Sequence, residues 1–286
     1  MAVVFTVWIF VLLMTQSYCE GSELEILMPN VSPQEDGAYL CTALNVTQNS
    51  DLYISMNCGN MGLGVCGPDS PEFILYAWGA NSPELSLPAS LGFKVGGNSG
   101  INYLVLQVHY GLVDRYLDEA LKDTSGLTLK MTIKKPTYLA GVSLLSGGSS
   151  AIPPRMRKWH IDADCLYNGQ AVLHPFAFRV HTNNLGTVVS GYRVRNGVFT
   201  LIGKEDPQKP QAFYPVVNNV DIRQGDMLAL RCTYNTMTED TVTYIGATLE
   251  DEMCNFYIMY YVNDQTELSG KCDNVDSNSL NFPVDV

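Results

Sequence analysis

Two short stretches of this sequence hold side chains that could bind a metal ion beside a carboxylate. They are Arg179-Val180-His181-Thr182-Asn183 and Met253-Cys254-Asn255-Phe256-Tyr257. Alternate side chains of a β-strand point to one face, so each stretch should present one set: Arg179, His181 and Asn183 from the first, and Met253, Asn255 and Tyr257 from the second. An imidazole and a thioether suit copper. A guanidinium and a phenol can hold a carboxylate. The pattern predicts a copper site with ligands missing, next to a carboxylate clamp.

The segments that must position these residues are short and β-rich. Apolar runs at 102–110, 127–133 and 198–202 are separated by Gly, Pro, Asn and Asp, a spacing typical of all-β sandwich or jelly-roll folds. Only 112–121 has a helical character. We expect a boundary near Lys134-Lys135-Pro136, with an N-terminal domain at 20–135, a C-terminal domain at 136–273 and a flexible tail at 274–286.

Length and charge limit the class of protein. The chain has 286 residues, enough for two domains, and a net charge of −12, which argues against a nucleic-acid partner. The apolar run 1–14 is shorter than the roughly 20 residues that span a bilayer. We interpret 1–19 as a signal peptide cleaved after Cys19, and we expect a protein of the secretory lumen or the exterior with no membrane association.

Cysteines and sequons agree with this compartment. The chain has eight Cys, one of them in the predicted signal peptide, so an odd number remains in the mature chain. An oxidising compartment should pair most of them and leave one unpaired. Asn30-Val31-Ser32 and Asn45-Val46-Thr47 are N-glycosylation sequons, which predicts glycans on Asn30 and Asn45.

Stretches spread over 24–272 carry a specific resemblance. In the second half they are 179–182, 191–197, 210–215 and 251–255, and in the first half 74–78, 92–97 and 106–110. These stretches resemble the peptidylglycine α-hydroxylating monooxygenase family of copper type II, ascorbate-dependent monooxygenases. The resemblance implies two antiparallel β-sandwich (jelly-roll-like) domains that face each other across a cleft, each with one copper. It also implies ascorbate as reductant, dioxygen as oxidant and glycine-extended peptides as substrates, hydroxylated in the first step of peptide amidation. A separate lyase would complete amidation, because no lyase domain follows in this sequence.

For the second domain, the resemblance assigns each residue of the opening stretches a role. The oxygen-binding copper corresponds to His181 and Met253, and Asn183 stands where the family has a further His ligand. An amide oxygen binds Cu(I) more weakly than imidazole does. Arg179 and Tyr257 correspond to the clamp for the terminal carboxylate. Asn255 corresponds to the contact with the peptide backbone.

The first domain lacks most of the copper ligands that the resemblance implies. His109 matches one of the three family ligands of the electron-storing copper, but the segment that should carry the adjacent His-His pair is absent after Asn45. We therefore expect fewer than two coppers. A replacement site built from Met56, Cys58 and Met61 is an alternative. The family pairing implies three disulfides and leaves Cys66 without its partner: Cys41–Cys58, Cys165–Cys272 and Cys232–Cys254.

Three interpretations remain. The chain is a peptidylglycine monooxygenase with unusual ligands, a secreted and catalytically degenerate relative that binds glycine-ended peptides, or an incomplete splice form or gene model of the active enzyme. Asn183 lies far from the missing segment, so restoring that segment would leave the second-domain site altered. Loss of ligands argues against full activity of the chain as written.

Overall fold

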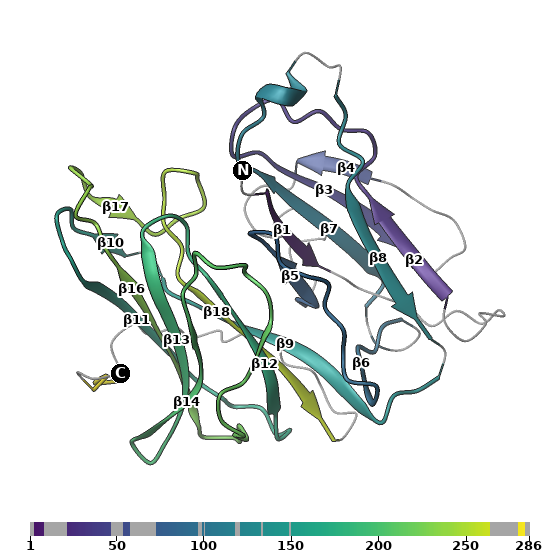
Figure 1. The fold of residues 1–286 in the computed structure, drawn as a ribbon. Helices are drawn as coiled ribbons and strands as arrows, with labels where there is room; N and C mark the ends of the chain where they lie inside the picture. Colours follow the sequence, from purple (N-terminus) through teal and green to yellow (C-terminus); the bar gives the residue numbers. More distant parts are fainter. Residues whose placement is uncertain are drawn as a thin grey trace. The chain divides into compact units, whose positions relative to one another are not determined.

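The computed structural model describes residues 3–8, 22–46, 54–57, 73–96, 99, 101–117, 121–132, 134–148, 150–263 and 280–283 (Figure 1). Within these residues the protein is all-β, which confirms the predicted class. Where the sequence predicts a short helix at 112–121, the described residues hold only a 3-10 turn, η1 (Asp114–Tyr116). None of the described segments forms a helix long and apolar enough to cross a membrane.

The chain divides into two compact units. The first comprises residues 1–81 and 87–139, and the second comprises 82–86 and 140–286. The sequence places the boundary between 135 and 136 and gives no sign that Ser82–Ser86 belongs with the second half. A cleft between the units and a jelly-roll strand order stay predictions.

The first unit is built on a five-stranded sheet with the order β4-β3-β7-β1-β5, beside a two-stranded sheet of β2 and β8. Its strands are β1 (Val3–Trp8), β2 (Ser22–Leu27), β3 (Tyr39–Asn45), β4 (Ile54–Asn57), β5 (Tyr76–Trp78), β6 (Leu91–Gly92), β7 (Tyr103–Tyr110) and β8 (Gly126–Met131). β7 is buried along all but its first residue. It therefore forms the core of this sheet.

Strand β1 comes from the segment that the sequence predicts to be a cleaved leader. Val3–Trp8 pairs antiparallel with β7 on one side and with β5 on the other. A leader removed after Cys19 could not hold this place in the mature protein. The same residues cannot both form β1 in the mature protein and be removed as a signal peptide, and removal of the leader stays a proposal.

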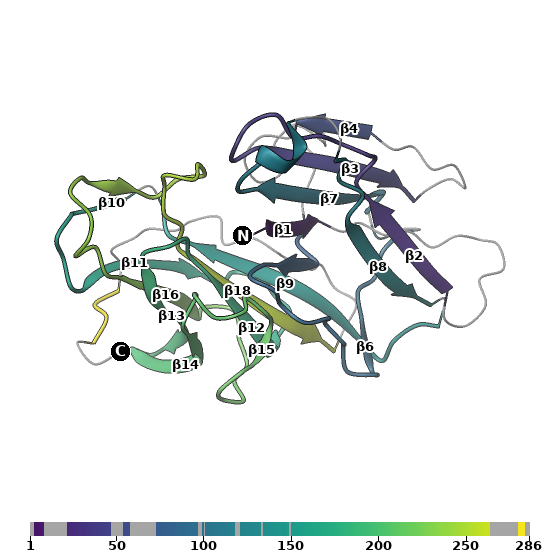
Figure 2. The same cartoon turned by 45° about the horizontal axis from the view of Figure 1, so that its top comes forward.

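The second unit contains the sheet β11-β16-β13-β14, the strands β15-β12-β18-β9 of a second large sheet, and a small sheet of β10 and β17 (Figures 1 and 2). The last strand of that second sheet, β6, pairs with Tyr138 and Leu139 at the start of β9, and these residues belong to the first unit. The strands of the second unit are β9 (Tyr138–Ser146), which begins at the unit boundary, β10 (Ala151–Ile152), β11 (Trp159–Leu166), β12 (His174–His181), β13 (Gly186–Arg195), β14 (Val198–Glu205), β15 (Tyr214–Pro215), β16 (Met227–Tyr234), β17 (Thr243–Tyr244) and β18 (Asn255–Val262).

Two aromatic rings and two glycines pack these sheets together. The rings of Phe178 on β12 and Phe256 on β18 stack with centroids 5.6 Å apart. A Cβ on Gly203 would lie 2.3 Å from the Phe178 ring, and one on Gly191 would lie 2.2 Å from the Phe256 ring. Since Phe178 and Phe256 point between the sheets, their neighbours along each strand point to the opposite face.

Part of the predicted flexible tail is packed. Leu280 and Phe282 lie against a cluster on the four-stranded sheet that includes Tyr192 and Val194. The Arg231 guanidinium lies 4.5 Å from the centroid of the Phe282 ring. These described residues of the tail are thus part of the second unit, and the other residues after 263 lie outside the described part.

Candidate metal centre and carboxylate clamp

The register of β12 and β18 brings four of the predicted residues together. The strands pair antiparallel, with Arg179 opposite Tyr257 and His181 opposite Asn255. All four are buried, and Arg179 is only 1% exposed. These positions alternate with Phe178 and Phe256, so they share the face that points away from the inter-sheet core, as the sequence predicts.

Met253 and Asn183 reach this region from loops. β12 ends at His181 and β18 begins at Asn255, so strand alternation applies to neither residue. The sulfur of Met253 nevertheless lies 3.1 Å from Nε2 of His181, and both side chains are buried. The structure brings the imidazole and the thioether together, although not by the geometry used to predict it.

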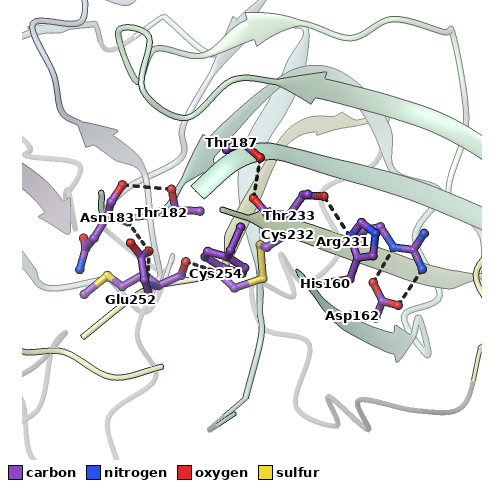
Figure 3. The surroundings of a disulfide bond; sticks show 12 residues. His160, Asp162, Thr182, Asn183, Thr187, Arg231, Cys232, Thr233, Glu252 and Cys254 are labelled. Atoms are coloured by element: carbon purple, nitrogen blue, oxygen red, sulfur yellow. Dashed lines mark hydrogen bonds and ion pairs between the residues drawn. A yellow bond between two sulfur atoms is a disulfide. The ribbon is translucent and has the colours of Figure 1, made fainter. Parts of the chain in front are cut away.

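Three neighbours hold the backbone around Met253 in place. The Tyr234 hydroxyl donates to the Met253 carbonyl at 2.7 Å, and the Met253 N–H donates to Glu252 Oε2 at 3.2 Å. The next residue, Cys254, forms a disulfide with Cys232 of β16 (Figure 3). This is the pairing that the family resemblance implies, and it ties the Met253 loop to the four-stranded sheet.

Glu252 joins this loop to the one that follows His181. Its carboxylate accepts the backbone N–H of Asn183 at 2.9 Å (Figure 3). It also accepts the backbone N–H of Leu185 at 2.6 Å. Burial raises the pKa of Glu252, while these N–H groups oppose the rise by stabilising the charged form. Sequence reasoning missed Glu252. Its place next to Met253, within the 251–255 stretch quoted for the resemblance, was the available signal.

Asn183 makes a structural contact at the position where the resemblance implies a ligand. Its Nδ2 donates to the Asp251 carbonyl at 2.7 Å. The amide nitrogen thereby braces the two loops that carry His181 and Met253. Among the described residues, the soft donors in direct contact at this site are His181 and Met253.

Arg179 is held by a residue that the sequence did not single out, Gln211. Nε of Arg179 donates to the Gln211 carbonyl at 2.9 Å, and Nη2 donates to Gln211 Oε1 at 3.0 Å. The guanidinium also lies 4.9 Å from the centre of the Tyr257 ring. Burial raises the pKa of the Tyr257 phenol, and the Arg179 charge opposes that rise. Gln211 lies within the 210–215 stretch quoted for the resemblance, which was the available signal.

The donors present fit a copper ion in part. The Nε2 of His181 and Sδ of Met253 are buried, adjacent and of the soft or borderline type that Cu(I) prefers. No group of three or more His, Cys, Asp and Glu side chains suited to a metal occurs in the described part of the chain. The site therefore offers a two-residue ligand set.

His109 of the first unit is set in different surroundings. It lies opposite Tyr39 of β3, and the two rings stack with centroids 3.9 Å apart. Its Nε2 is buried and has no hydrogen-bond partner among the described residues. Burial lowers the pKa of His109 to about 4, although a hydrogen bond to the Gly37 backbone acts in the opposite direction. A buried acceptor without a hydrogen bond costs about 1–3 kcal/mol. The Nε2 lone pair is therefore available to bind a metal ion or to accept a hydrogen bond.

The remaining predicted residues are described in part. Cys41 and Cys165 are in disulfides, but their implied partners Cys58 and Cys272 lie outside the described residues, as do Cys66 and Met61. The side chain of Met56 is not described either. Of the two sequons, Asn30 is exposed, whereas Nδ2 of Asn45 donates to the Tyr103 hydroxyl at 3.2 Å.

Comparison with known proteins decides the family. The model of the copper type II ascorbate-dependent monooxygenase C-terminal domain matches residues 138–281, and that of the N-terminal domain matches residues 55–116. The chain belongs to this family. Copper and ascorbate are thus the cofactor and reductant of the family to which this chain belongs.

The similar proteins include peptidyl-glycine alpha-amidating monooxygenases and dopamine beta-hydroxylases. The chain is 42% identical over 265 residues to peptidyl-glycine alpha-amidating monooxygenase A of Xenopus laevis, which covers 84% of this chain and 28% of the relative. It is 40% identical over 269 residues to the enzyme of Rattus norvegicus, covering 86% of this chain and 27% of the relative. Human dopamine beta-hydroxylase is 30% identical over 207 residues, 68% of this chain and 33% of the relative. The chain spans less than a third of the length of the peptidyl-glycine relatives.

Proposed function

We propose that this chain binds peptides ending in glycine and hydroxylates the α-carbon of that glycine with copper, ascorbate and dioxygen. The observation that carries the proposal is the register of β12 and β18, which sets the cation Arg179 and the phenol Tyr257 on the same face as His181. The likeness to peptidyl-glycine monooxygenases supports glycine as the terminal residue.

The residues divide the work as follows. Arg179 and Tyr257 bind the terminal carboxylate, and Asn255 contacts the peptide backbone next to it. His181 and Met253 would hold copper, which supplies the one-electron chemistry that activates dioxygen when it is bound. Holding the carboxylate fixes the position of the adjacent α-carbon. One C–H bond becomes C–OH with one oxygen atom of O₂, and the other oxygen becomes water with two electrons from ascorbate and two protons.

Binding without turnover is the second candidate. His109 is the sole His in residues 1–139, so the first unit has no second imidazole for an electron-storing copper. Asn183 makes a structural contact in the second unit. We propose fewer than two coppers per chain on these grounds. If the transcript contained a further exon between the codons for Val46 and Asp51, the chain would instead be an incomplete form of the enzyme.

Turnover and binding separate the candidates. The purified chain, loaded with copper and given ascorbate and a glycine-ended peptide, should yield a product heavier by one oxygen atom in mass spectrometry. Arg179→Ala should weaken peptide binding about 30-fold or more, because a buried charged contact is lost. Arg155→Ala is the control, since Arg155 pairs with Asp240 at an exposed site of the same unit. Binding without product favours the second candidate, and equal binding by both variants overturns the clamp.

We also propose that the protein works in the secretory pathway or outside the cell. The predicted leader, the disulfide between Cys232 and Cys254 and the exposed sequon at Asn30 support this location. Its hydroxyglycine product would pass to a separate lyase that completes amidation. Mass spectrometry of the protein from culture medium tests the location, and its absence from the medium and the secretory lumen would contradict it.

A further inference from the structure

Gln211 contacts both the predicted metal ligand and the predicted carboxylate clamp. It lies between β14 and β15 on no strand and is 7% exposed. Its Oε1 accepts hydrogen bonds from His181 Nδ1 at 2.7 Å and from Arg179 Nη2 at 3.0 Å. Two functional groups that act on different partners therefore share one acceptor atom.

The orientation of the Gln211 amide follows from its four contacts. Its Nε2 donates to the Pro207 carbonyl at 3.1 Å and to the Thr182 carbonyl at 3.4 Å. An arginine can only donate and a carbonyl can only accept, so a flipped amide would oppose like groups on both sides. The oxygen must face Arg179 and His181.

This orientation determines the tautomer of His181. Because Oε1 cannot donate, the proton of the 2.7 Å contact belongs to His181 Nδ1. In the neutral ring Nε2 then carries the lone pair, and it faces the sulfur of Met253 at 3.1 Å. A second hydrogen bond of this kind raises the basicity of a metal-binding imidazole. Gln211 thus prepares Nε2 as a ligand.

The same residue orients the Arg179 guanidinium. The Gln211 carbonyl and Oε1 bind Nε and Nη2, which fixes the plane of the fork. Gln211 is neutral, so these bonds orient the positive charge without cancelling it. A carboxylate that binds Arg179 would compete with Gln211 for the guanidinium N–H groups. The hydrogen bond from Arg179 Nη2 to Gln211 Oε1 would then become weaker. Oε1 would then accept more strongly from His181.

We propose that Gln211 is a positioning residue that couples the two sites, so that a peptide carboxylate on Arg179 and Cu(I) on His181 strengthen each other's binding. This inference rests on the proposed function, because the carboxylate is that of the glycine-ended peptide. Coupling between sites is reciprocal, and its usual size corresponds to about fivefold or more in affinity. The effect is a property of equilibrium binding, not of turnover.

The test is an anaerobic titration of the whole chain with a glycine-ended peptide, with and without bound Cu(I). In the unaltered protein the peptide should bind about fivefold tighter when Cu(I) is present. Gln211→Met keeps the length of the side chain but removes the shared acceptor. It should bind Cu(I) about tenfold more weakly and show the same peptide affinity with and without the metal.

Gln208→Met is the matched control. Gln208 lies in the same loop, but its Nε2 donates to the carbonyls of Asn183 and Gly186 rather than to the clamp. This variant should keep the Cu(I)-dependent gain in peptide affinity. A general loosening of the loop would affect both variants alike, which would contradict a specific role for Gln211.

The outcomes separate this inference from the proposed function. If the unaltered protein binds the peptide equally well with and without Cu(I), the coupling is overturned while peptide binding stands. That measurement uses only the unaltered protein. The inference can therefore be overturned even if the Gln211→Met protein does not fold. Retention of the gain in a folded Gln211→Met protein would also overturn it. If the unaltered protein binds no peptide at all, the proposed function fails, and the inference fails with it.

Discussion

The two units place an imidazole in contrasting surroundings. His181 has its Nδ1 hydrogen-bonded by Gln211 and its Nε2 against a thioether. The Nε2 of His109 is buried with no partner among the described residues, and its ring stacks on Tyr39. Both histidines lie on central strands, so the strand alone does not make a ligand site. What differs is the loop that supplies a second donor and the contacts that hold this loop.

The largest expected effect concerns copper content. After reconstitution with Cu(I) and removal of the excess, we expect about one copper per chain. His181→Ala should lose it, with affinity falling about 100-fold, whereas His109→Ala should retain it. Metal analysis of the desalted proteins measures this. Two tightly bound coppers in the unaltered chain would break the contrast between the units.

The disulfide beside Met253 should account for the next largest effect. Cys232 and Cys254 are 22 residues apart, and replacing both with Ala should cost about 3 kcal/mol by the loop-entropy estimate. The freed Met253 loop should also bind Cu(I) more weakly. Calorimetric unfolding of the full chain and Cu(I) titration measure the two effects. Unchanged copper affinity would show that Glu252 and Tyr234 hold the loop without the disulfide.

A glycine tests the packing behind the clamp. Gly191→Ala would place a Cβ 2.2 Å from the Phe256 ring, whose neighbour Tyr257 belongs to the proposed clamp. Overpacking of this kind should destabilise the second unit by about 1–3 kcal/mol and weaken peptide binding. Gly148→Ala is the control, because nothing lies within 4 Å of its added Cβ. Equal stabilities of the two variants would contradict this packing.

The smallest expected effect is on acid stability of the second unit. Burial alone would raise the pKa of Asp226, but its bonds to Arg195 and to the Arg223 N–H outweigh burial and hold the pKa below the ordinary value. The folded state therefore binds the proton less readily than the unfolded state. The stabilisation is complete above the unfolded pKa, near 3.8, and is lost as the pH falls through the folded value.

Asp226→Asn should accordingly be less stable at neutral pH by about 1 kcal/mol. The gap to the unaltered protein should close as the pH falls below about 4. Denaturant titrations across pH measure the gap. A gap that stays constant down to pH 2 would show that the Asp226 charge contributes nothing.

The strands and the face shared by Arg179 and His181 were predictable because both follow short-range rules. Alternation along β12 and β18 was enough to place Arg179 with His181 and Asn255 with Tyr257. The contacts of Gln211 and Glu252 were not predictable this way. Gln211 reaches Arg179 from a loop 32 residues further along, and Glu252 reaches Asn183 across 69 residues. Such contacts depend on how loops meet after the sheets have formed, and no periodicity records them.

The place of β1 links the integrity of a sheet to protein processing. Val3–Trp8 separates β5 from β7, and the predicted cleavage after Cys19 would remove it. β7 would then present a row of unpaired N–H and C=O groups, the kind of edge at which protein chains associate. In the precursor, the segment that cleavage would remove covers this edge of β7. Self-association should therefore distinguish a processed chain from one that keeps its first residues.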